Sequence, residues 1–189
     1  MDVVTKHTRA QRLYVVELLS YWEGQINSTT LREIFGLSRQ QASADINRYI
    51  DQRPRNLSYN SSAKSYQATS IFSPAQITGD VAEYLNWIQV GQLPQTQNPI
   101  TVAHTALELP ARKVSPQVMR GLIAAIRKHQ RVEVDYVSLT NPNSEGRVIA
   151  PHTFVKTGLR WHLRAWCEKS QQYRDFVLSR FWFTAAQAA

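Results

Sequence analysis

Residues 28–51 constrain the fold more than any other part of the chain, because two segments with apolar stripes meet there at one glycine. Leu31 and Ile34 recur at helical spacing before Gly36, and Ser38 starts a second stretch of helical periodicity. Glycine adopts a left-handed backbone without steric cost, and serine is a preferred N-cap. The pattern therefore predicts a helix, a tight turn and a second, capped helix.

The ends of these two helices follow from their capping residues. Serine and threonine at positions 28–30 offer N-caps for a short helix over residues 31–35, with Glu33 placed to assist. The second helix runs from Ser38 to about Asp51, because the next proline ends it. Two short helices joined in this way predict a helix-turn-helix.

The outer face of the second helix carries side chains that can contact DNA. Ala42 and Ile46, with Tyr49 or Ile50, form the inner stripe, and Ala42 is small where the helices cross. Arginine can pair with guanine through two hydrogen bonds, and glutamine or asparagine can pair with adenine. The first part of the second helix meets the bases, so we assign base contacts to Arg39, Gln40, Gln41 and Ser43. We assign phosphate contacts to Arg48, Arg53, Arg55 and Lys64, and further DNA contacts to Thr29, Thr30, Ser38 and Asn47.

The segments on either side complete a winged helix-turn-helix. Residues 7–22 have an apolar helical stripe that ends at Gly24. Tyr59 and Tyr66 alternate with polar residues across a turn of small residues, which predicts a hairpin in the position of a wing. The alternative is an ordinary helical hairpin with a solvated polar face. The coincidence of cap, glycine, small crossing residue and hairpin favours the DNA-binding interpretation.

The charge of the chain is unevenly distributed. The net charge is +8, with +3 in residues 1–70, −3 in residues 71–110 and +8 in residues 111–189. A basic surface attracts polyanions. The two basic blocks indicate two separate anion-binding regions, although solubilising charge would explain the second block taken alone.

The second half has one helix followed by several short strands. Ser115 and Pro116 begin a helix that extends to His129. From Arg131 the apolar period becomes two, and strands are predicted over 131–137, 147–157, 159–167 and 173–183. Such a series predicts a small barrel, because closure removes exposed strand edges.

The predicted fold is therefore α+β, with three regions along the chain. Residues 1–70 form the winged helix-turn-helix, and residues 115–189 form the barrel. Residues 71–114 form a helical linker, with a helix over about 77–90 before a turn-rich stretch at 91–99.

Charged residues interrupt two of the predicted strands at regular places. His162, Arg164 and Trp166 share one strand face, and the strand over 173–183 places Arg174, Phe176, Leu178 and Arg180 on one face. Arginine on a buried strand needs a carboxylate partner or a bound anion. Asp175 or Glu168 could pair with one arginine. Alternatively, the arginines extend into solvent from the rim of a barrel.

These segments resemble a known family. Trp161-His162-Leu163 is similar to the Trp-Tyr-Leu signature of WYL-domain proteins, with histidine in place of tyrosine. The segments 132–136, 149–152 and 173–180 also match the pattern of that domain. With a winged helix-turn-helix ahead of it, the chain resembles the WYL-domain transcriptional regulators, especially BrxR/CapW-like repressors of anti-phage defence operons.

The resemblance implies a mechanism and a ligand site. It implies a homodimer on an inverted-repeat DNA operator, and an Sm-like barrel that senses a nucleotide or oligonucleotide effector. An activator instead of a repressor stays open. We also expect this chain to lack the C-terminal extension that usually supports dimerisation in the family. The ligand positions implied are Tyr136, His152, His162, Arg164, Arg174 and Arg180.

Other functional classes have less support. We expect no enzyme, catalytic residue, metal or cofactor, since the chain has no glycine-rich phosphate loop and its five histidines lack metal-ligand spacing. Cys167 and His162 could in principle form a nucleophile and a base, but the alternation of side chains along a strand places them on opposite faces. An RNA or single-stranded nucleic-acid binding module remains the alternative, because aromatic and basic residues share the barrel segment.

The sequence also predicts where the protein works. No signal peptide and no membrane-spanning run of apolar residues is visible. We therefore expect a cytoplasmic, nucleoid-associated bacterial protein with no membrane partner.

Overall fold

The computed structural model describes residues 7–91, 113–139, 145–158 and 160–182. Chain contacts divide the protein into an N-terminal unit that contains residues 7–79 and a C-terminal unit that contains residues 113–182. Residues of the intervening helix contribute to both. Each unit is described by itself.

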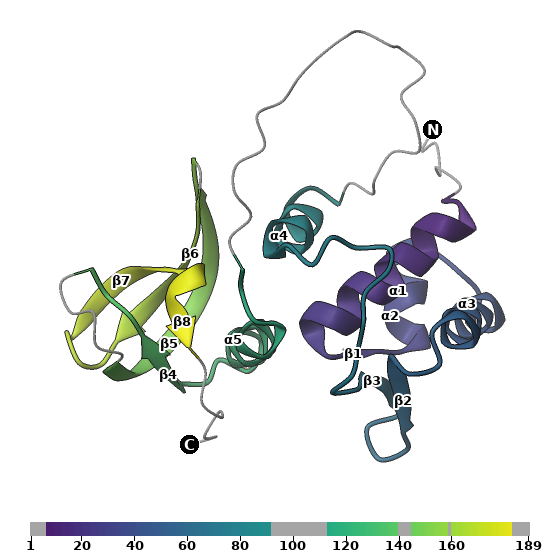
Figure 1. Ribbon diagram of the computed structural model, residues 1–189, viewed down its shortest axis with the longest axis horizontal. Coiled ribbons are helices and arrows are strands. Elements are labelled where there is room, and N and C mark those ends of the chain that lie inside the picture. Colours follow the sequence, from purple (N-terminus) through teal and green to yellow (C-terminus); the bar gives the residue numbers. More distant parts are fainter. Residues whose placement is uncertain (1–6, 92–112, 140–144, 159, 183–189) are drawn as a thin grey trace, which may run out of the picture. The chain divides into compact units, whose positions relative to one another are not determined.

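The N-terminal unit is a group of three helices with a small antiparallel sheet (Figure 1). The sheet has the order β1-β3-β2, and β2 and β3 form the predicted wing. Its elements are α1 (Arg9–Glu23), β1 (Gln25–Ile26), α2 (Ser28–Phe35), α3 (Arg39–Gln52), β2 (Leu57–Asn60) and β3 (Ser65–Ala68).

The first helix follows the sequence prediction closely. Thr8 and Gln11 form a capping box at its start, and Gly24 ends it with a left-handed backbone at φ 82°. The apolar face is buried, including Leu18 and Trp22. This helix is the centre of the N-terminal core.

The helix-turn-helix is confirmed, but the start predicted for its first helix was wrong. Asn27 is the N-cap of α2, because its Oδ1 accepts a hydrogen bond from the Thr30 N–H at 2.9 Å. Residues 28–30 are therefore the first turn of the helix and do not precede it. The second helix begins as predicted, with Ser38 and Gln41 in a capping box.

Gly36 joins the two helices in a left-handed conformation, with φ 64° and ψ 31°. A β-carbon added there would meet no atom within 4 Å, so the cost of a substitution is conformational.

We expect Gly36→Ala to lower the free energy of unfolding by about 1 kcal/mol. Gly36→Asn should cost less, because asparagine tolerates this region. Thermal unfolding of both variants measures the difference, and equal stability of all three proteins would contradict it.

The wing has a third strand that the sequence analysis missed. Residues Gln25 and Ile26 pair with Gln67 and Tyr66 of β3. A two-residue strand has too few positions to show a period, so no sequence pattern could reveal it. It connects the end of α1 to the wing and fixes the wing to the helical core.

The connecting segment contains one described helix, α4 (Val81–Val90). The Asp80 carboxylate caps it by accepting from the Ala82 N–H at 2.8 Å, so the helix starts four residues after the predicted position. Val81, Tyr84 and Leu85 are buried. Over the described residues, no helix is both long and apolar enough to cross a membrane.

The C-terminal unit is one helix with a five-stranded antiparallel sheet of order β7-β6-β5-β4-β8 (Figure 1). The α+β class is therefore confirmed. The last strand returns to pair with the first strand of the sheet. Its elements are α5 (Pro116–Lys128), β4 (Val132–Tyr136), β5 (Glu145–Thr157), β6 (Arg160–Cys167), β7 (Gln172–Val177), the 3-10 helix η1 (Leu178–Arg180) and β8 (Phe181–Trp182).

The prediction of one continuous strand over 173–183 was wrong. The 3-10 turn η1 follows Val177 and separates β7 from β8. This break ends the alternation that placed Arg174 and Arg180 on one face. A 3-10 turn changes the chain direction, and that change lets β8 reach the opposite edge of the sheet.

An aromatic cluster shows that the sheet curls. Tyr136 of β4 contacts Phe176 of β7 at 5.0 Å between ring centroids, although β5 and β6 separate these strands in the sheet. It also contacts Phe181 of β8 at 5.1 Å. The Val177 N–H donates to the Tyr136 hydroxyl at 3.2 Å. The two edge strands therefore approach one core in a barrel-like curl, while the pairings among described residues leave the sheet open.

Candidate nucleic-acid interface and ligand cleft

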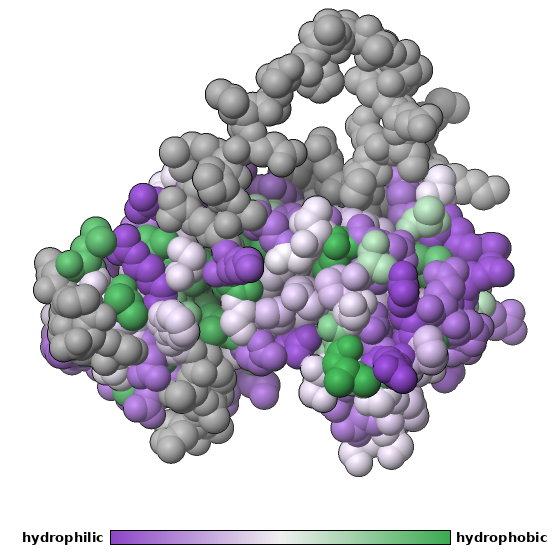
Figure 2. Space-filling model, viewed as in Figure 1, coloured by the Kyte–Doolittle hydropathy of each residue, from purple (hydrophilic) through white to green (hydrophobic). Residues whose placement is uncertain are grey.

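The positions predicted to contact DNA lie on the surface of the N-terminal unit. In Figure 2 the surface on the right of the view, over α3, is mainly hydrophilic. Thr30 and Ser43 are half-buried. The exposed positions are Thr29, Ser38, Arg39, Gln40, Gln41, Asn47, Arg48, Arg53, Arg55 and Lys64.

Two of these side chains also have a structural role. The Gln41 side-chain oxygen accepts from the Ser38 N–H at 3.3 Å, and the Ser38 hydroxyl accepts from the Gln41 N–H at 3.2 Å. The amide NH₂ group of Gln41 is therefore the part of this side chain that could reach a base. Arg39 and Gln40 have no part in this capping box, so they are the stronger candidates for base contacts.

The wing is attached to the same face. Tyr66 of β3 donates a hydrogen bond from its hydroxyl to Asn47 Oδ1 of α3 at 3.3 Å. Tyr59 lies opposite Tyr66 in the hairpin, with 5.1 Å between ring centroids. This hydrogen bond joins α3 directly to the wing.

A buried ion pair holds α3 against α1. Arg12 Nε donates to Asp45 Oδ2 at 2.6 Å, and the two side chains are only 17% and 7% exposed. Arg12 also donates to the His7 carbonyl at 2.8 Å. Asp45 was not among the predicted inner residues of this helix, although its spacing from Ala42 and Tyr49 places it on the inner stripe.

A second buried network joins three parts of the N-terminal unit. Glu17 of α1 is fully buried, and its Oε1 accepts from the backbone N–H groups of Ala75, Gln76 and Ile77. Its Oε2 accepts from the Tyr49 hydroxyl of α3 at 2.9 Å. Burial raises the pKa of Tyr49, and the neighbouring Glu17 carboxylate adds to this effect. Glu17 thus connects α3 to the chain that follows the wing.

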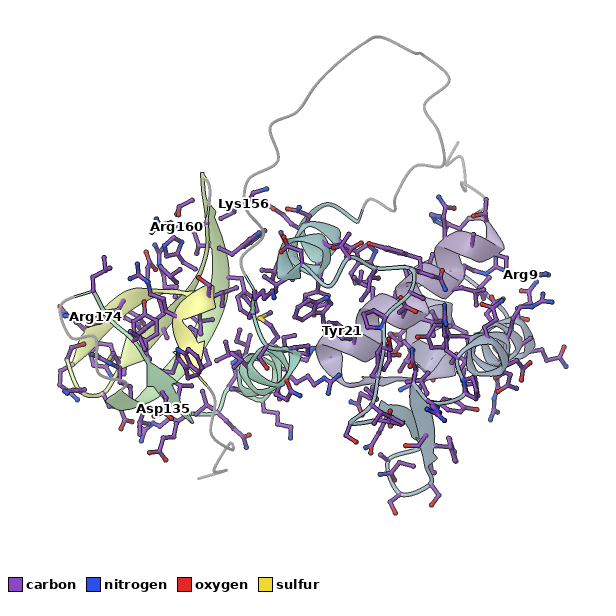
Figure 3. All side chains as sticks on the ribbon, in the orientation of Figure 1. Arg9, Tyr21, Asp135, Lys156, Arg160 and Arg174 are labelled. Atoms are coloured by element: carbon purple, nitrogen blue, oxygen red, sulfur yellow. The ribbon has the colours of Figure 1, made fainter. Side chains whose placement is uncertain are left out.

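The C-terminal unit has a surface cleft of about 800 Å³ beside β5, β6 and β7. Three of the six predicted ligand positions line it: His152, Arg164 and Arg174. Figure 3 shows Arg174 on β7. The other lining residues are His129, Gln130, Ala150, Pro151, Trp166, Tyr173 and Asp175.

The remaining three predicted positions lie outside the lining of this cleft. Tyr136 is only 8% exposed and belongs to the aromatic core. His162 is half-buried, with its Nδ1 3.0 Å from the Thr157 hydroxyl. Arg180 is half-buried in η1. Their assignment as ligand contacts stays a prediction from the resemblance.

The arginines of the cleft have different partners. Arg164 Nε and Nη2 donate to the two Asp175 oxygens at 2.7 and 2.9 Å. These hydrogen bonds lower the pKa of Asp175 and raise that of Arg164. Glu168, the other acid considered, pairs with Arg131 instead. With the Gln172 amide oriented to satisfy both groups, its oxygen accepts from Arg174 at 2.8 Å.

One wall of the cleft is aromatic. Tyr173 is 67% exposed and contacts Trp166 at 5.2 Å and His152 at 5.7 Å between ring centroids. Tyr173 was not among the predicted ligand positions. Alternation along β6 places Trp166 on the same strand face as Arg164, but it concerns that strand alone. The Trp166↔Tyr173 pairing across β6 and β7 is what brings Tyr173 to this wall.

The residues considered for catalysis and metal binding are not brought together. Cys167 is buried with Leu163 and Ala165, whereas His162 faces the other side of β6. Within the part of the chain that the structure describes, no group of three His, Cys, Asp or Glu could hold a metal ion. The cleft instead combines arginines with an aromatic wall, which are binding groups for an anion with an aromatic part.

Both units match models of known domain families. Residues 8–90 match the model of the BrxR transcriptional regulator winged helix-turn-helix domain, and residues 117–184 match the WYL domain. The chain is similar to the DNA-binding transcriptional repressor CapW of Escherichia coli, at 36% identity over 90% of this chain. It is similar to CapW of Pseudomonas aeruginosa at 34% identity over the same share. The chain spans 58% of the length of each relative.

A solved structure gives a weaker match. Proteasome accessory factor B/C of Arthrobacter aurescens matches 97% of this chain and 34% of its own length. The identity is 14% and the TM-score is 0.36. The family models and the repressor relatives agree with the resemblance found in the sequence. The chain belongs to the WYL-domain proteins that carry a BrxR-type winged helix-turn-helix domain.

Proposed function

We propose that this protein is a sequence-specific DNA-binding transcriptional repressor that reads duplex DNA through α3 and the wing. The observation that carries this proposal is the exposed face of α3, a helix that is capped at its start and joined to the wing by the Tyr66–Asn47 hydrogen bond. Arginine and glutamine at the start of a recognition helix are well suited to base edges. The repressor relatives support the same function.

The proposal includes an assembly and a setting. Two copies of the chain bind as a homodimer to an inverted-repeat operator, with half-sites about one helical turn or a small multiple apart. The operator controls a phage-defence operon in the cytoplasm. The division into a DNA-binding part at 1–70, a linker at 71–114 and a sensing part at 115–189 is likewise our proposal.

In the same proposal, the cleft of the C-terminal unit senses a nucleotide or oligonucleotide. Arg164, paired with Asp175, and Arg174, hydrogen-bonded to an amide, provide cationic groups for a phosphate. The aromatic wall of the cleft provides a stacking surface for a base. A ligand changes operator binding only if it binds the two states of the dimer with different affinity.

Selection of bound duplexes from a random pool tests the DNA-binding function. We expect the full chain to enrich an inverted repeat, and its affinity to fall steeply as salt increases. The selection is repeated with mononucleotides and short oligonucleotides to find an effector that changes enrichment. A pool that shows no enriched sequence would contradict sequence-specific recognition.

A second candidate function is binding of RNA or single-stranded nucleic acid. Besides the cleft, Lys156 lies over the Trp161 ring at 5.8 Å from its centroid, near Arg160 at the end of the β5–β6 hairpin (Figure 3). Competition between the selected duplex and its separate strands distinguishes the candidates. Equal affinity of the full chain for duplex and single strand would favour the second.

A further inference from the structure

Arg164 and Asp175 face each other across β6 and β7 inside the cleft. Two hydrogen bonds, of 2.7 and 2.9 Å, join the guanidinium to both carboxylate oxygens. A guanidinium binds two phosphate oxygens with this same forked geometry. The Asp175 carboxylate therefore occupies the position that a phosphate would take on Arg164.

The surroundings of the pair indicate which phosphates could compete with Asp175. Arg174 hydrogen-bonds to the neutral Gln172 amide, so that contact leaves its charge uncancelled. Tyr173, 67% exposed beside Trp166, offers a ring face at the same cleft. A phosphate attached to a base could use both groups, whereas an isolated anion could use only the arginines.

We propose that Asp175 is a built-in competitor for the phosphate of a nucleotide ligand. Its carboxylate holds the Arg164 fork while the cleft is empty, and the ligand phosphate displaces it on binding. This inference rests on the proposed ligand-sensing function of the cleft. The ligand class is a phosphate joined to a nucleobase, either as a mononucleotide or within an oligonucleotide.

The exposure of the pair makes displacement feasible. The side chains of Arg164 and Asp175 are 47% and 40% exposed, and exposed ion pairs contribute little net stability. Once displaced, the carboxylate can be solvated again by water. Competition of this kind disfavours small anions and favours a ligand that gains additional contacts from the aromatic wall and Arg174.

Asp175→Asn tests the proposal, because asparagine has the same shape without the charge. We expect the full-chain variant to bind adenosine 5′-monophosphate about three- to tenfold more tightly than the parent in calorimetric titration. Glu133→Gln, which removes an exposed charge from β4 outside the cleft lining, is the matched control and should leave the affinity unchanged. Unchanged affinity of Asp175→Asn would overturn the competitor role.

A second pair of variants separates competition from simple repulsion between charges. In an Arg164→Ala background the fork no longer exists, so Asp175→Asn should then improve binding by less than about twofold. A full gain in that background would show that Asp175 repels the ligand without competing for Arg164, and would overturn the proposal. Thermal unfolding checks that the variants remain folded.

The choice of probe distinguishes the sources of the phosphate. It also separates a failure of the proposed ligand sensing from a failure of the competitor role. Inorganic phosphate, adenosine 5′-monophosphate and a deoxyadenosine dinucleotide without terminal phosphates are titrated into each protein. Tighter binding of the mononucleotide or of the dinucleotide identifies which form of nucleotide the site takes. If the parent and Asp175→Asn bind none of the probes, the ligand-sensing function itself fails. If the parent binds but the variant shows no gain, only the competitor role fails.

Discussion

Replacing Arg39 and Gln40 together by alanine is expected to weaken binding of the selected operator by about a hundredfold or more. Each two-bond contact with a base contributes about 1–3 kcal/mol of discrimination, and 2.8 kcal/mol corresponds to about a hundredfold. Both side chains are exposed on the first turn of α3, and alanine favours helix, so folding should be unaffected. Fluorescence anisotropy with labelled operator measures the loss.

A matched control removes one amide and one cationic group from another part of the chain. Gln117→Ala/Lys128→Ala deletes one amide and one cation from exposed positions of α5, and should leave operator affinity within about twofold. Arg48→Ala separates base contacts from phosphate contacts. If Arg48 binds a phosphate, its loss weakens binding to all DNA sequences alike. It also reduces the slope of log affinity against log salt concentration by about one. Equal operator binding by the Arg39/Gln40 variant and the parent would contradict the recognition surface.

Glu17→Ala is expected to have the largest effect on stability, a loss of about 3–5 kcal/mol from the N-terminal unit. The substitution leaves three backbone N–H groups and the buried Tyr49 hydroxyl without their common acceptor. Glu17→Gln should lose less, because an amide oxygen can still accept from part of the set. The loss should also weaken operator binding, because Glu17 contacts α3 through Tyr49.

Hydrogen exchange measures this change within one unit. Peptides from α1 and α3 report the opening free energy of the N-terminal unit, separately from the C-terminal sheet. Glu33→Ala, an exposed carboxylate on α2, is the control and should change stability by no more than about 0.5 kcal/mol. A Glu17→Ala protein that exchanges like the parent would show that the network contributes little.

The comparison of α2 with α3 shows how far local sequence could predict the fold. Ser38 and Gln41 are three residues apart and cap α3 within one turn, so the sequence pattern predicted its start. For α2 the neighbouring residues 27–30 include several capable caps, and Asn27 was overlooked among them. Local rules indicate that a helix begins in such a stretch, but they do not choose between adjacent caps.

The cleft shows what periodicity could and could not predict about a site. Strand alternation correctly grouped Arg164 with Trp166, because successive side chains of a strand point to opposite faces. It failed for Arg180, because η1 interrupts the strand and no run of residues signalled that break. Pairing of Arg164 with Asp175 was one of two alternatives, and the register of β6 against β7 selects it.

The order of helix, turn, helix and wing could be read from the amino-acid sequence alone, as could the change to strand periodicity in the second half. These are properties of neighbouring residues: caps, a glycine and the spacing of apolar side chains. The folded chain was needed to show that Glu17 accepts hydrogen bonds from residues about sixty positions away, and that Tyr136 lies in the core. It was also needed to show that Tyr173 and Asp175 share a cleft with Arg164. Contacts of this kind depend on strand register and chain reversal, which no local spacing encodes.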